Sequence, residues 1–309
     1  MLPRLLSAVP ALFAVAAAAS LPSYDRTFWS TWGDGQAELA GYDLTIPRYN
    51  QPRRGVAVTI FVTETFSNSA RVKADPGKHP PADEYPVIKL NLVKDYQTGI
   101  YDYNEMTSSF VALQPVNGRA AGSPTRISFS RQEWCGQIYH QLLFDAKAIR
   151  ATRHSYFDGD GDGRRDLDYP PDGVAEDTLM LWARGMAAPS LATGESRTVP
   201  MLPSLPSQKS IDAAWITATL SRPPKPQSIT VPAGTFVVEA MAVRLPDKQT
   251  RIFYVEQAAP RRIVKWESSA GEHAELLKSD RMKYWQMNGD GYESALSRIG
   301  LARRPPRTP

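Results

Sequence analysis

Apolar and polar residues alternate along most of the chain, and this alternation limits the fold more than any other feature of the sequence. In RGVAVTIFVTETF, every second residue is apolar and branched: Val56, Val58, Ile60 and Val62. Side chains of a β-strand point alternately to the two faces of a sheet, so these residues share a face. The pattern recurs between Pro and Gly residues in PVIKLNLVKDY, TRISFSR, AAWITATL, GTFVVEAMAV and TRIFYVE. Alternation of this kind is typical of antiparallel sheets.

One segment departs from the alternation and divides the chain. VAEDTLMLWARGMA carries apolar residues at helical spacing, which predicts a short helix over 174–186 within an N-terminal β region, 28–186. Residues 187–210 are rich in Pro and Ser, which predicts an extended connection. The remaining β segment, 211–300, is small enough to complete the same sheet. We therefore predict a mainly β protein, a strongly curved antiparallel sheet or open half-barrel with one short helix.

The chain begins MLPRLLSAVPALFAVAAAAS, a sequence typical of export signals. Arg4 precedes an apolar run from Leu5 to Ala19, and the small residues Ala17 and Ala19 suit cleavage by signal peptidase. We predict a signal peptide over 1–19 and a periplasmic or secreted protein, with an uncleaved anchor as the alternative. No later stretch approaches about eighteen apolar residues, so the sequence predicts no transmembrane segment.

Charge and cysteine content exclude some classes of protein. The formal net charge is +4, and the basic residues are scattered instead of forming a stripe, so we expect no nucleic-acid partner. The last residues, 301–309, form a basic tail, LARRPPRTP. Cys135 is the only cysteine, so no internal disulfide can form and stability must come from a hydrophobic core.

Aspartates and glycines alternate in residues 156–169, YFDGDGDGRRDLDY. A calcium loop places its ligands at alternate positions because their oxygens then converge inside a tight turn. Five predicted ligands occupy such positions: Asp158, Asp160, Asp162, the Arg164 carbonyl and Asp166. Gly163 follows the third aspartate, where the backbone must turn sharply. We predict a structural Ca²⁺ here, within an acidic loop over 158–172.

The acidic loop is not an EF-hand. Tyr169 occupies the position of the bidentate glutamate, and Pro170 and Pro171 prevent a helix from leaving the loop. The missing ligand would come from one of four downstream carboxylates: Asp168, Asp172, Glu176 or Asp177. The alternative interpretation is a solvated Asp-Gly turn between two strands, which needs no metal.

A reaction centre is harder to find. Cys135 and His140 in SRQEWCGQIYHQ are the candidates for a nucleophile and its base, although at strand spacing they point to opposite faces. The four histidines form no metal-binding pair, which argues against zinc. Nucleophile-elbow and phosphate-loop motifs are absent from the sequence. A hydrolase that uses carboxylates without a motif remains open.

Two aromatic clusters suggest a binding surface. Tyr101 and Tyr103 lie in IYDY, and Trp134 and Tyr139 flank the cysteine. In a curved sheet these four rings could line a concave apolar groove for a hydrophobic small molecule, a lipid acyl chain or a peptide. The alternative is that they belong to the hydrophobic core.

Several stretches resemble known families. WGDGQAELAGYDLTIPRYNQPRRGVAVTIFVTETF, VIKLNLVKDYQTGIYDYNEMTSSF and SRQEWCGQIYHQ resemble secreted bacterial proteins without an assigned activity, which are often labelled septum formation inhibitor Maf. True Maf proteins are cytoplasmic nucleotide pyrophosphatases with an N-terminal Ser-x-Arg-Arg type loop, which this chain lacks. TVPAGTFVVEAMAVR resembles the hairpin of a periplasmic domain family of unknown function, whose domains look like curved sheets related to lipoprotein carriers. This resemblance implies a curved antiparallel sheet.

The sequence therefore leads to three functional hypotheses. The first is an exported, non-catalytic envelope or extracellular protein that binds a hydrophobic or extended ligand on a concave β face. The second is a hydrolase that uses Cys135 or unrecognised carboxylates. The third is a structural or interaction protein of the cell envelope.

Overall fold

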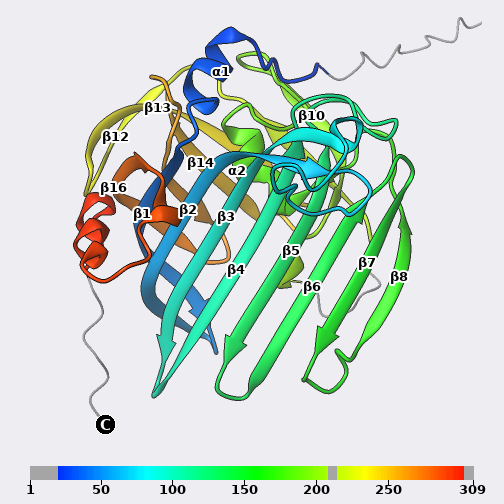
Figure 1. The fold of residues 1–309 in the computed structure, drawn as a ribbon. Coiled ribbons are helices and arrows are strands. Elements are labelled where there is room, and N and C mark those ends of the chain that lie inside the picture. Colours follow the sequence, from blue (N-terminus) through cyan, green and yellow to red (C-terminus); the bar gives the residue numbers. More distant parts are fainter. Residues whose placement is uncertain (1–19, 208–213, 303–309) are drawn as a thin grey trace, which may run out of the picture.

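A computed structural model of the chain describes residues 20–207 and 214–302. The predicted signal peptide, the end of the predicted connection (208–210), the start of the C-terminal segment (211–213) and most of the basic tail (303–309) lie outside the described residues. The prediction of a mainly β protein is confirmed, because the described residues form one large curved sheet with a few short helices (Figure 1).

Sixteen strands in the described part of the chain form this sheet. Their spatial order is β8-β7-β6-β5-β4-β3-β2-β1-β16-β15-β14-β13-β11-β10-β9, and β12 pairs with β13 outside this path. All pairings are antiparallel except that of β9 with β10. The strands of the first half are β1 (Ala37–Arg48), β2 (Gln51–Ser67), β3 (Glu84–Thr98), β4 (Tyr101–Ala112), β5 (Pro124–Glu133), β6 (Gly136–Phe144), β7 (Ala148–Ser155) and β8 (Gly163–Asp168). Those of the second half are β9 (Val174–Ala175), β10 (Ser196–Leu202), β11 (Ile216–Ser221), β12 (Gln227–Val231), β13 (Gly234–Arg244), β14 (Thr250–Glu256), β15 (Ile263–Ser268) and β16 (His273–Met282).

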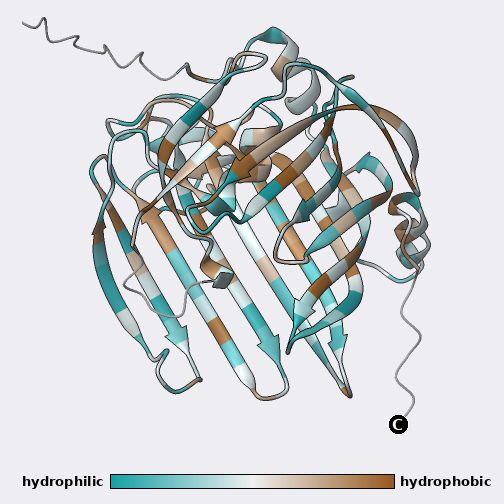
Figure 2. Cartoon of the chain, turned by 180° about the vertical axis from the view of Figure 1, so that it is seen from behind, coloured by the Kyte–Doolittle hydropathy of each residue, from teal (hydrophilic) through white to brown (hydrophobic). Residues whose placement is uncertain are grey.

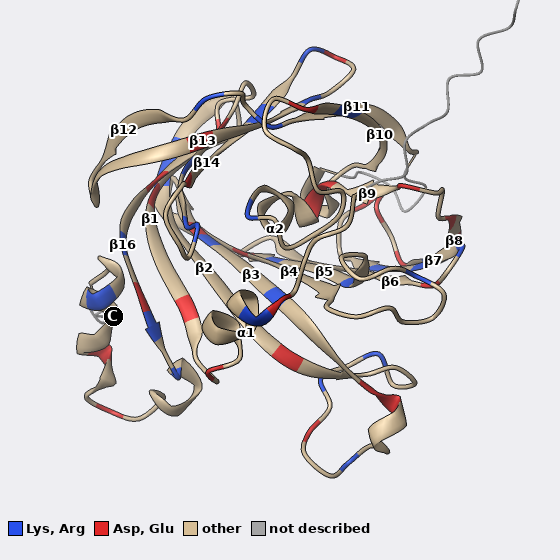
Figure 3. Ribbon diagram, turned by 90° about the horizontal axis from the view of Figure 1, so that it is seen from above, with Lys and Arg blue, Asp and Glu red and all other residues tan. Residues whose placement is uncertain are grey.

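The two halves of the chain meet where β1 pairs with β16. This pairing continues the sheet from the N-terminal meander into the C-terminal strands, with Leu39 opposite Asp280 and Leu44 opposite Ala274. The two ends of the described sheet, β8 and β9, do not pair with each other, so the sheet curls without closing (Figure 3).

β-bulges contribute to the curvature. The register shifts between Gly41 and Tyr42 in β1, and again within β4 and β14. A bulge adds one residue to one strand, which bends that strand and increases its twist. Gly41 is also needed for close packing, because a Cβ there would lie 2.2 Å from the Ile299 carbonyl oxygen. The bulged strands turn the sheet around an interior face.

Helix α2 (Leu179–Ala183) fills part of this interior (Figure 3). Leu181 and Trp182 are buried against residues of the surrounding strands. The helix predicted over 174–186 is therefore too long. Its first two residues form β9, and the next three, Glu176–Thr178, form a 3₁₀ turn. Gly185, which has a φ of +79°, lies just beyond the end of α2.

Two further elements differ from the sequence prediction. Helix α1 (Arg26–Trp32) was missed, although Asp25 caps it by accepting hydrogen bonds from the Thr27 and Phe28 amides at 2.9 and 3.0 Å. The predicted connection 187–210 contains strand β10. Its proline and serine content obscures an alternation that buries Val199 and Met201. The remaining 3₁₀ turns are Pro81–Asp83, Leu205–Ser207, Tyr284–Gln286 and Tyr292–Ile299.

A buried ion pair fixes α2 to the sheet. Arg184, which follows α2, donates to the Glu38 carboxylate of β1 from both terminal nitrogens, at 2.6 and 3.0 Å. The same guanidinium lies over the rings of Trp32 and Phe61, 5.1 and 4.2 Å from their centroids. Since both charged groups are almost fully buried, the contact holds the helix at one depth inside the curl.

Candidate functional site

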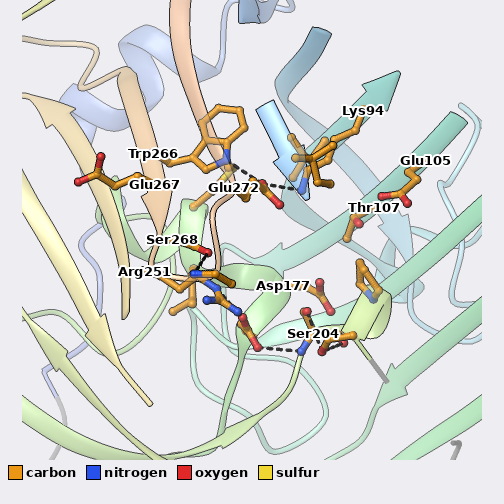
Figure 4. A pocket seen from close by; sticks show the side chains of 18 of the residues that line it. Lys94, Glu105, Thr107, Asp177, Ser204, Arg251, Trp266, Glu267, Ser268 and Glu272 are labelled. Carbon is orange, nitrogen blue, oxygen red and sulfur yellow. Dashed lines mark hydrogen bonds and ion pairs between the residues drawn. The ribbon is translucent and has the colours of Figure 1, made fainter. Parts of the chain in front are cut away.

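The interior of the curled sheet holds a cavity of about 330 Å³ below α2 (Figure 4). Strands β1, β3, β4, β5, β14 and β15 form its walls, and α2, the 204–207 segment and the β15–β16 turn border it. Apolar side chains cover much of its surface: Leu90, Leu92, Leu179, Met180, Phe253 and Trp266. Nine charged side chains lie among them: Arg48, Lys94, Glu105, Arg131, Glu176, Asp177, Arg251, Glu267 and Glu272.

Strand register explains how charged residues reach the interior. Lys94 follows Leu90 and Leu92 at every second position of β3, so it shares their interior face. Lys94 is opposite Glu105 of β4, and Glu105 is opposite Arg131 of β5. Lys94 therefore lies on the same face as the apolar residues of its strand.

Glu105 accepts two hydrogen bonds at the lower end of the cavity. The Tyr96 hydroxyl donates to Glu105 Oε1 at 2.9 Å, and Arg131 Nε donates to the same oxygen at 2.7 Å. The carboxylate and the guanidinium are both largely buried. This pairing leaves the carboxylate neutralised and rigid, which suits a wall of the cavity better than a reacting group.

A second ion pair crosses the cavity wall. Lys94 Nζ lies 2.7 Å from Glu272 Oε1, and the Trp266 indole N–H donates to that oxygen at 2.9 Å (Figure 4). Burial alone would raise the pKa of Glu272, but the Lys94 ammonium and the indole donor together hold it below its usual value. Glu272 is therefore ionised in the folded protein at neutral pH.

Asp177 is in the opposite electrostatic situation. Desolvation by burial raises its pKa to about 7, and the neighbouring Glu176 carboxylate adds to this effect. One hydrogen bond from the Leu205 amide, at 2.9 Å, and the charge of Lys94 only partly oppose the rise. Glu176 itself is paired with Arg251 Nε at 3.1 Å. Asp177 is thus the cavity carboxyl that changes its protonation near neutral pH.

Three of the four predicted ligand-binding rings lie together beside the cavity. Tyr103 stacks on Tyr96, a cavity residue, with ring centroids 5.1 Å apart. Tyr101 is 5.8 Å from Tyr103, and Trp134 stacks on Tyr101 at 6.1 Å. Tyr103 is fully buried, whereas Trp134 is 64% exposed. The rings form a continuous path from the solvent to the cavity wall.

Tyr139 does not belong to this path. Its neighbour His140 points to the interior opposite Phe129, so strand alternation places Tyr139 on the outer face. There its hydroxyl contacts Arg126 and Gln141, at 3.3 and 2.9 Å.

Cys135 and His140 do not form a catalytic pair in this structure. Cys135 is exposed in the β5–β6 turn, where a hydrogen bond to the Glu133 carboxylate raises the pKa of its thiol. His140 is buried inside the sheet, and its desolvation and the Arg153 charge lower its pKa to about 4. At about 3.3 Å per residue, four positions of strand β6 separate His140 from the residue after the cysteine by roughly 13 Å.

Three of the predicted calcium ligands lie in the turn between β7 and β8, and each has its own partner. Asp158 accepts from the Gly159 amide at 3.0 Å, and Asp160 lies 2.9 Å from Arg153. Asp162 faces His154 at 3.3 Å and the Ser155 amide at 3.2 Å. Arg164 and Asp166 lie in β8. Within 20–207 and 214–302, no group of three or more His, Cys, Asp or Glu side chains is arranged to hold a metal ion.

Most of the cavity's polar residues were not predicted from the sequence. A detectable signal existed for Lys94, because a lysine in phase with the buried leucines of a strand must either be paired or face a cavity. Arg251 gives the same signal, in phase with Phe253 and Val255 of β14. Glu272 gives no such sequence signal, because it lies in the β15–β16 turn and reaches the cavity only through the curvature of the sheet.

Comparisons with known proteins add no identification. No family model matches the chain, and neither the curated proteins nor the solved structures contain a match. The resemblances drawn from sequence stretches thus remain predictions. Among the described residues, no helix is long and apolar enough to cross a membrane.

Proposed function

We propose that the protein binds a neutral or cationic amphipathic small molecule in the cavity of its curled sheet, without transforming it. The observation that carries this proposal is the combination of apolar walls with one carboxyl, Asp177, that has no charged partner within hydrogen-bonding distance in the described part of the chain. The apolar part of the ligand would pack on Leu92, Met180 and Phe253. Its hydroxyl or amine would hydrogen-bond to Asp177.

The charge of the cavity favours such a ligand over an anionic one. Lys94 and Arg251 are each already paired, with Glu272 and Glu176. An anionic ligand that took the place of either carboxylate beside Lys94 or Arg251 Nε would have to break one of these partly buried pairs, which is costly. A donor group meets no such competition at Asp177.

The setting we propose for this activity is outside the cytoplasm, in the periplasm or the medium. Support for export comes from the sequence of residues 1–19 alone. A ligand carrier in these compartments is consistent with the concave binding face expected from the sequence.

Cavity filling tests the binding proposal. Thr107 lines the cavity, whereas its neighbour Met106 is 41% exposed on the other face of β4. We expect the neutral dye N-phenyl-1-naphthylamine to fluoresce with the wild-type protein and with Met106→Trp, and about tenfold more weakly with Thr107→Trp. Equal fluorescence of all three proteins, or none with the wild type, would refute the proposal. Circular dichroism of each variant checks that the sheet is retained.

The pKa contrast between two cavity carboxyls favours one second candidate, a carboxylate-dependent hydrolase. The raised pKa of Asp177 suits a general acid, and the lowered pKa of Glu272 suits a base or nucleophile. Turnover of aryl glycosides or esters that is lost in both Asp177→Asn and Glu272→Gln would establish this candidate and displace the binding proposal. A panel without turnover leaves binding as the function.

A further inference from the structure

Three successive hairpin turns at one end of the sheet each expose a large apolar side chain. Because consecutive strands are antiparallel, the β1–β2, β3–β4 and β5–β6 turns lie at the same end, at the bottom of Figure 1. They expose Tyr49, Ile100 and Trp134, which are 57%, 80% and 64% accessible. Within the described part of the chain, nothing covers these side chains.

The exposed rings are connected to one another and to the cavity. The hydroxyls of Tyr49 and Tyr103 are 2.6 Å apart, and Trp134 stacks on Tyr101 at 6.1 Å. Tyr103 in turn stacks on Tyr96 at the cavity wall. The packed rings hold the turns in fixed positions, so the three exposed side chains form a rigid edge. This set, Tyr49, Ile100 and Trp134, is called the aromatic edge below.

Unpaired positive charge accompanies the aromatic edge. The Arg48 guanidinium lies over the rings of Tyr49 and Tyr103, 4.9 and 4.8 Å from their centroids. Neither Arg48 nor Arg53 makes an ion pair with a carboxylate among the described residues, and both flank the β1–β2 turn. Two unneutralised guanidinium groups next to exposed aromatic rings suit the phosphates of a lipid headgroup layer.

We propose that the aromatic edge docks the protein on a phospholipid bilayer, with its three side chains at headgroup level and Arg48 and Arg53 on lipid phosphates. Adjacent strands are about 4.8 Å apart, so neighbouring turns of the edge are roughly 10 Å apart. Isolated apolar side chains in such a row suit a planar, fluid interface, where Trp and Tyr rings are preferred. Side chains at this spacing do not form the closely packed, fully buried core that a protein–protein interface has.

The position of the edge relates docking to the proposed cavity function. Arg48 and Tyr96 line the cavity, and Ser268 and Ala270 line it from the β15–β16 turn at the same end of the sheet. A bilayer in contact with the aromatic edge would therefore lie next to the cavity entrance, and could supply an amphipathic ligand. The docking inference goes beyond ligand binding and does not depend on it.

The acidic turn between β7 and β8 determines how the protein would lie on the surface. This turn exposes the Tyr156 ring, which is 75% accessible, beside Asp158 and Asp162, and these two carboxylates would be repelled by anionic lipid. The protein would consequently contact the bilayer mainly through the β1–β2, β3–β4 and β5–β6 turns.

Sedimentation with large unilamellar vesicles tests the inference, using phosphatidylcholine alone and with one-third phosphatidylglycerol. We expect the wild-type protein to bind both, more tightly with phosphatidylglycerol because of the two arginines. The combined variant Tyr49→Ala, Ile100→Ala, Trp134→Ala should bind at least about tenfold more weakly to both. Trp285→Ala is the matched control, an exposed tryptophan beyond the far end of β16, and should bind like the wild type.

Two further measurements separate this inference from the proposed function. Arg53→Gln should reduce the preference for vesicles that contain phosphatidylglycerol. The combined variant should still give the wild-type fluorescence with N-phenyl-1-naphthylamine, which would show that its cavity is intact. Wild-type protein that stays in the supernatant with both vesicles overturns the inference, as does equal sedimentation of the combined variant. Self-association of the wild type that the combined variant loses, without vesicle binding, would assign the edge to a second copy of the chain instead.

Discussion

Lys94 and Glu272 are 178 residues apart in the sequence, yet their ammonium and carboxylate groups are 2.7 Å apart in the cavity wall. Lys94 belongs to the N-terminal meander, and Glu272 to the turn before β16. The contact can form only when β1 and β16 have paired and curved the sheet. It therefore couples the stability of the fold to the geometry of the candidate site.

Replacing Lys94 with methionine should destabilise the protein and perturb Glu272. The Lys94 and Glu272 side chains are 13% and 24% exposed. The loss of unfolding free energy should therefore lie between that of a surface ion pair and that of a fully buried one, at about 2 kcal/mol at pH 7. Lys94 lowers the Glu272 pKa, so this stabilisation is present above the ordinary pKa of 4.5 and is lost as the pH falls below it. Urea unfolding at pH 7 and pH 4 should show a smaller difference between the two proteins at pH 4.

The matched control for this variant is Arg54→Met. Arg54 pairs with Asp43 at 3.0 Å, but the two side chains are 81% and 44% exposed. Solvent screens this pair, so its removal should leave the free energy of unfolding nearly unchanged. If both variants lost the same stability, the Lys94 pair would have no special role.

Strand positions were predictable because they depend on local alternation, but the choice of interior face was not. In β2 the interior residues are Ala57, Thr59 and Phe61, whereas Val58 and Ile60 lie on the other face. That face is also partly covered, by residues of the 284–301 segment such as Ile299. Both faces of the strand are therefore apolar, and alternation alone cannot identify the concave one. Figure 2 shows both kinds of residue alternating along the strands.

The candidate site was predictable only at its aromatic end. Tyr101 and Tyr103 come close to Trp134 because β4 and β5 are neighbours in a meander, an arrangement expected from the short spacing of the strands. The sequence indicates Asp177 only as one of four carboxylates that could complete a calcium site. The raised pKa of Asp177 arises mainly from burial inside the curled sheet, a tertiary effect that no local pattern encodes.

The buried pair of Arg184 and Glu38 provides a second stability prediction. Glu38→Gln leaves the guanidinium without a counter-ion at a position where its side chain has no exposed surface. We expect the variant to lose about 3 kcal/mol of unfolding free energy. Chemical unfolding monitored by tryptophan fluorescence measures this loss, since Trp32 lies against the same guanidinium. A loss below about 1 kcal/mol, the range of surface pairs, would contradict it.

The acidic turn can be tested for structure and for calcium separately. Asp160 pairs with the buried Arg153, so Asp160→Asn should lower the melting temperature by about 1–3 °C even in chelator. Among the described residues, the hydrogen bond of Asp158 is with the next amide and no ion pair involves it, so Asp158→Asn should have no effect in chelator. The calcium hypothesis predicts that millimolar calcium raises the wild-type melting temperature and that Asp158→Asn abolishes this rise. If calcium does not raise the melting temperature of the wild-type protein, the calcium hypothesis is wrong, and the Asp160–Arg153 pair alone accounts for the stability of the turn.

The protonation of Asp177 should give the protein a distinctive pH dependence. Burial raises the Asp177 pKa from 3.8 to about 7, so the folded protein binds this proton more tightly than the unfolded chain. The associated stabilisation is complete below pH 3.8 and is lost as the pH rises towards 7. In this window the wild-type protein should lose up to about 1.4 kcal/mol of stability per pH unit relative to Asp177→Asn.

Urea unfolding of both proteins between pH 4 and pH 8 measures this difference, and Asp162→Asn, which alters an exposed carboxylate, serves as the control. Asp177→Asn should be the more stable protein at pH 8, because it never places a charge at this site. Binding should respond in the same range if Asp177 holds the ligand. A cationic dye should bind the wild type more tightly at pH 8 than at pH 6, and Asp177→Asn should bind it equally at both. Parallel stability curves for the wild type and Asp177→Asn would show that the carboxyl is solvated, and would remove the main support for the binding proposal.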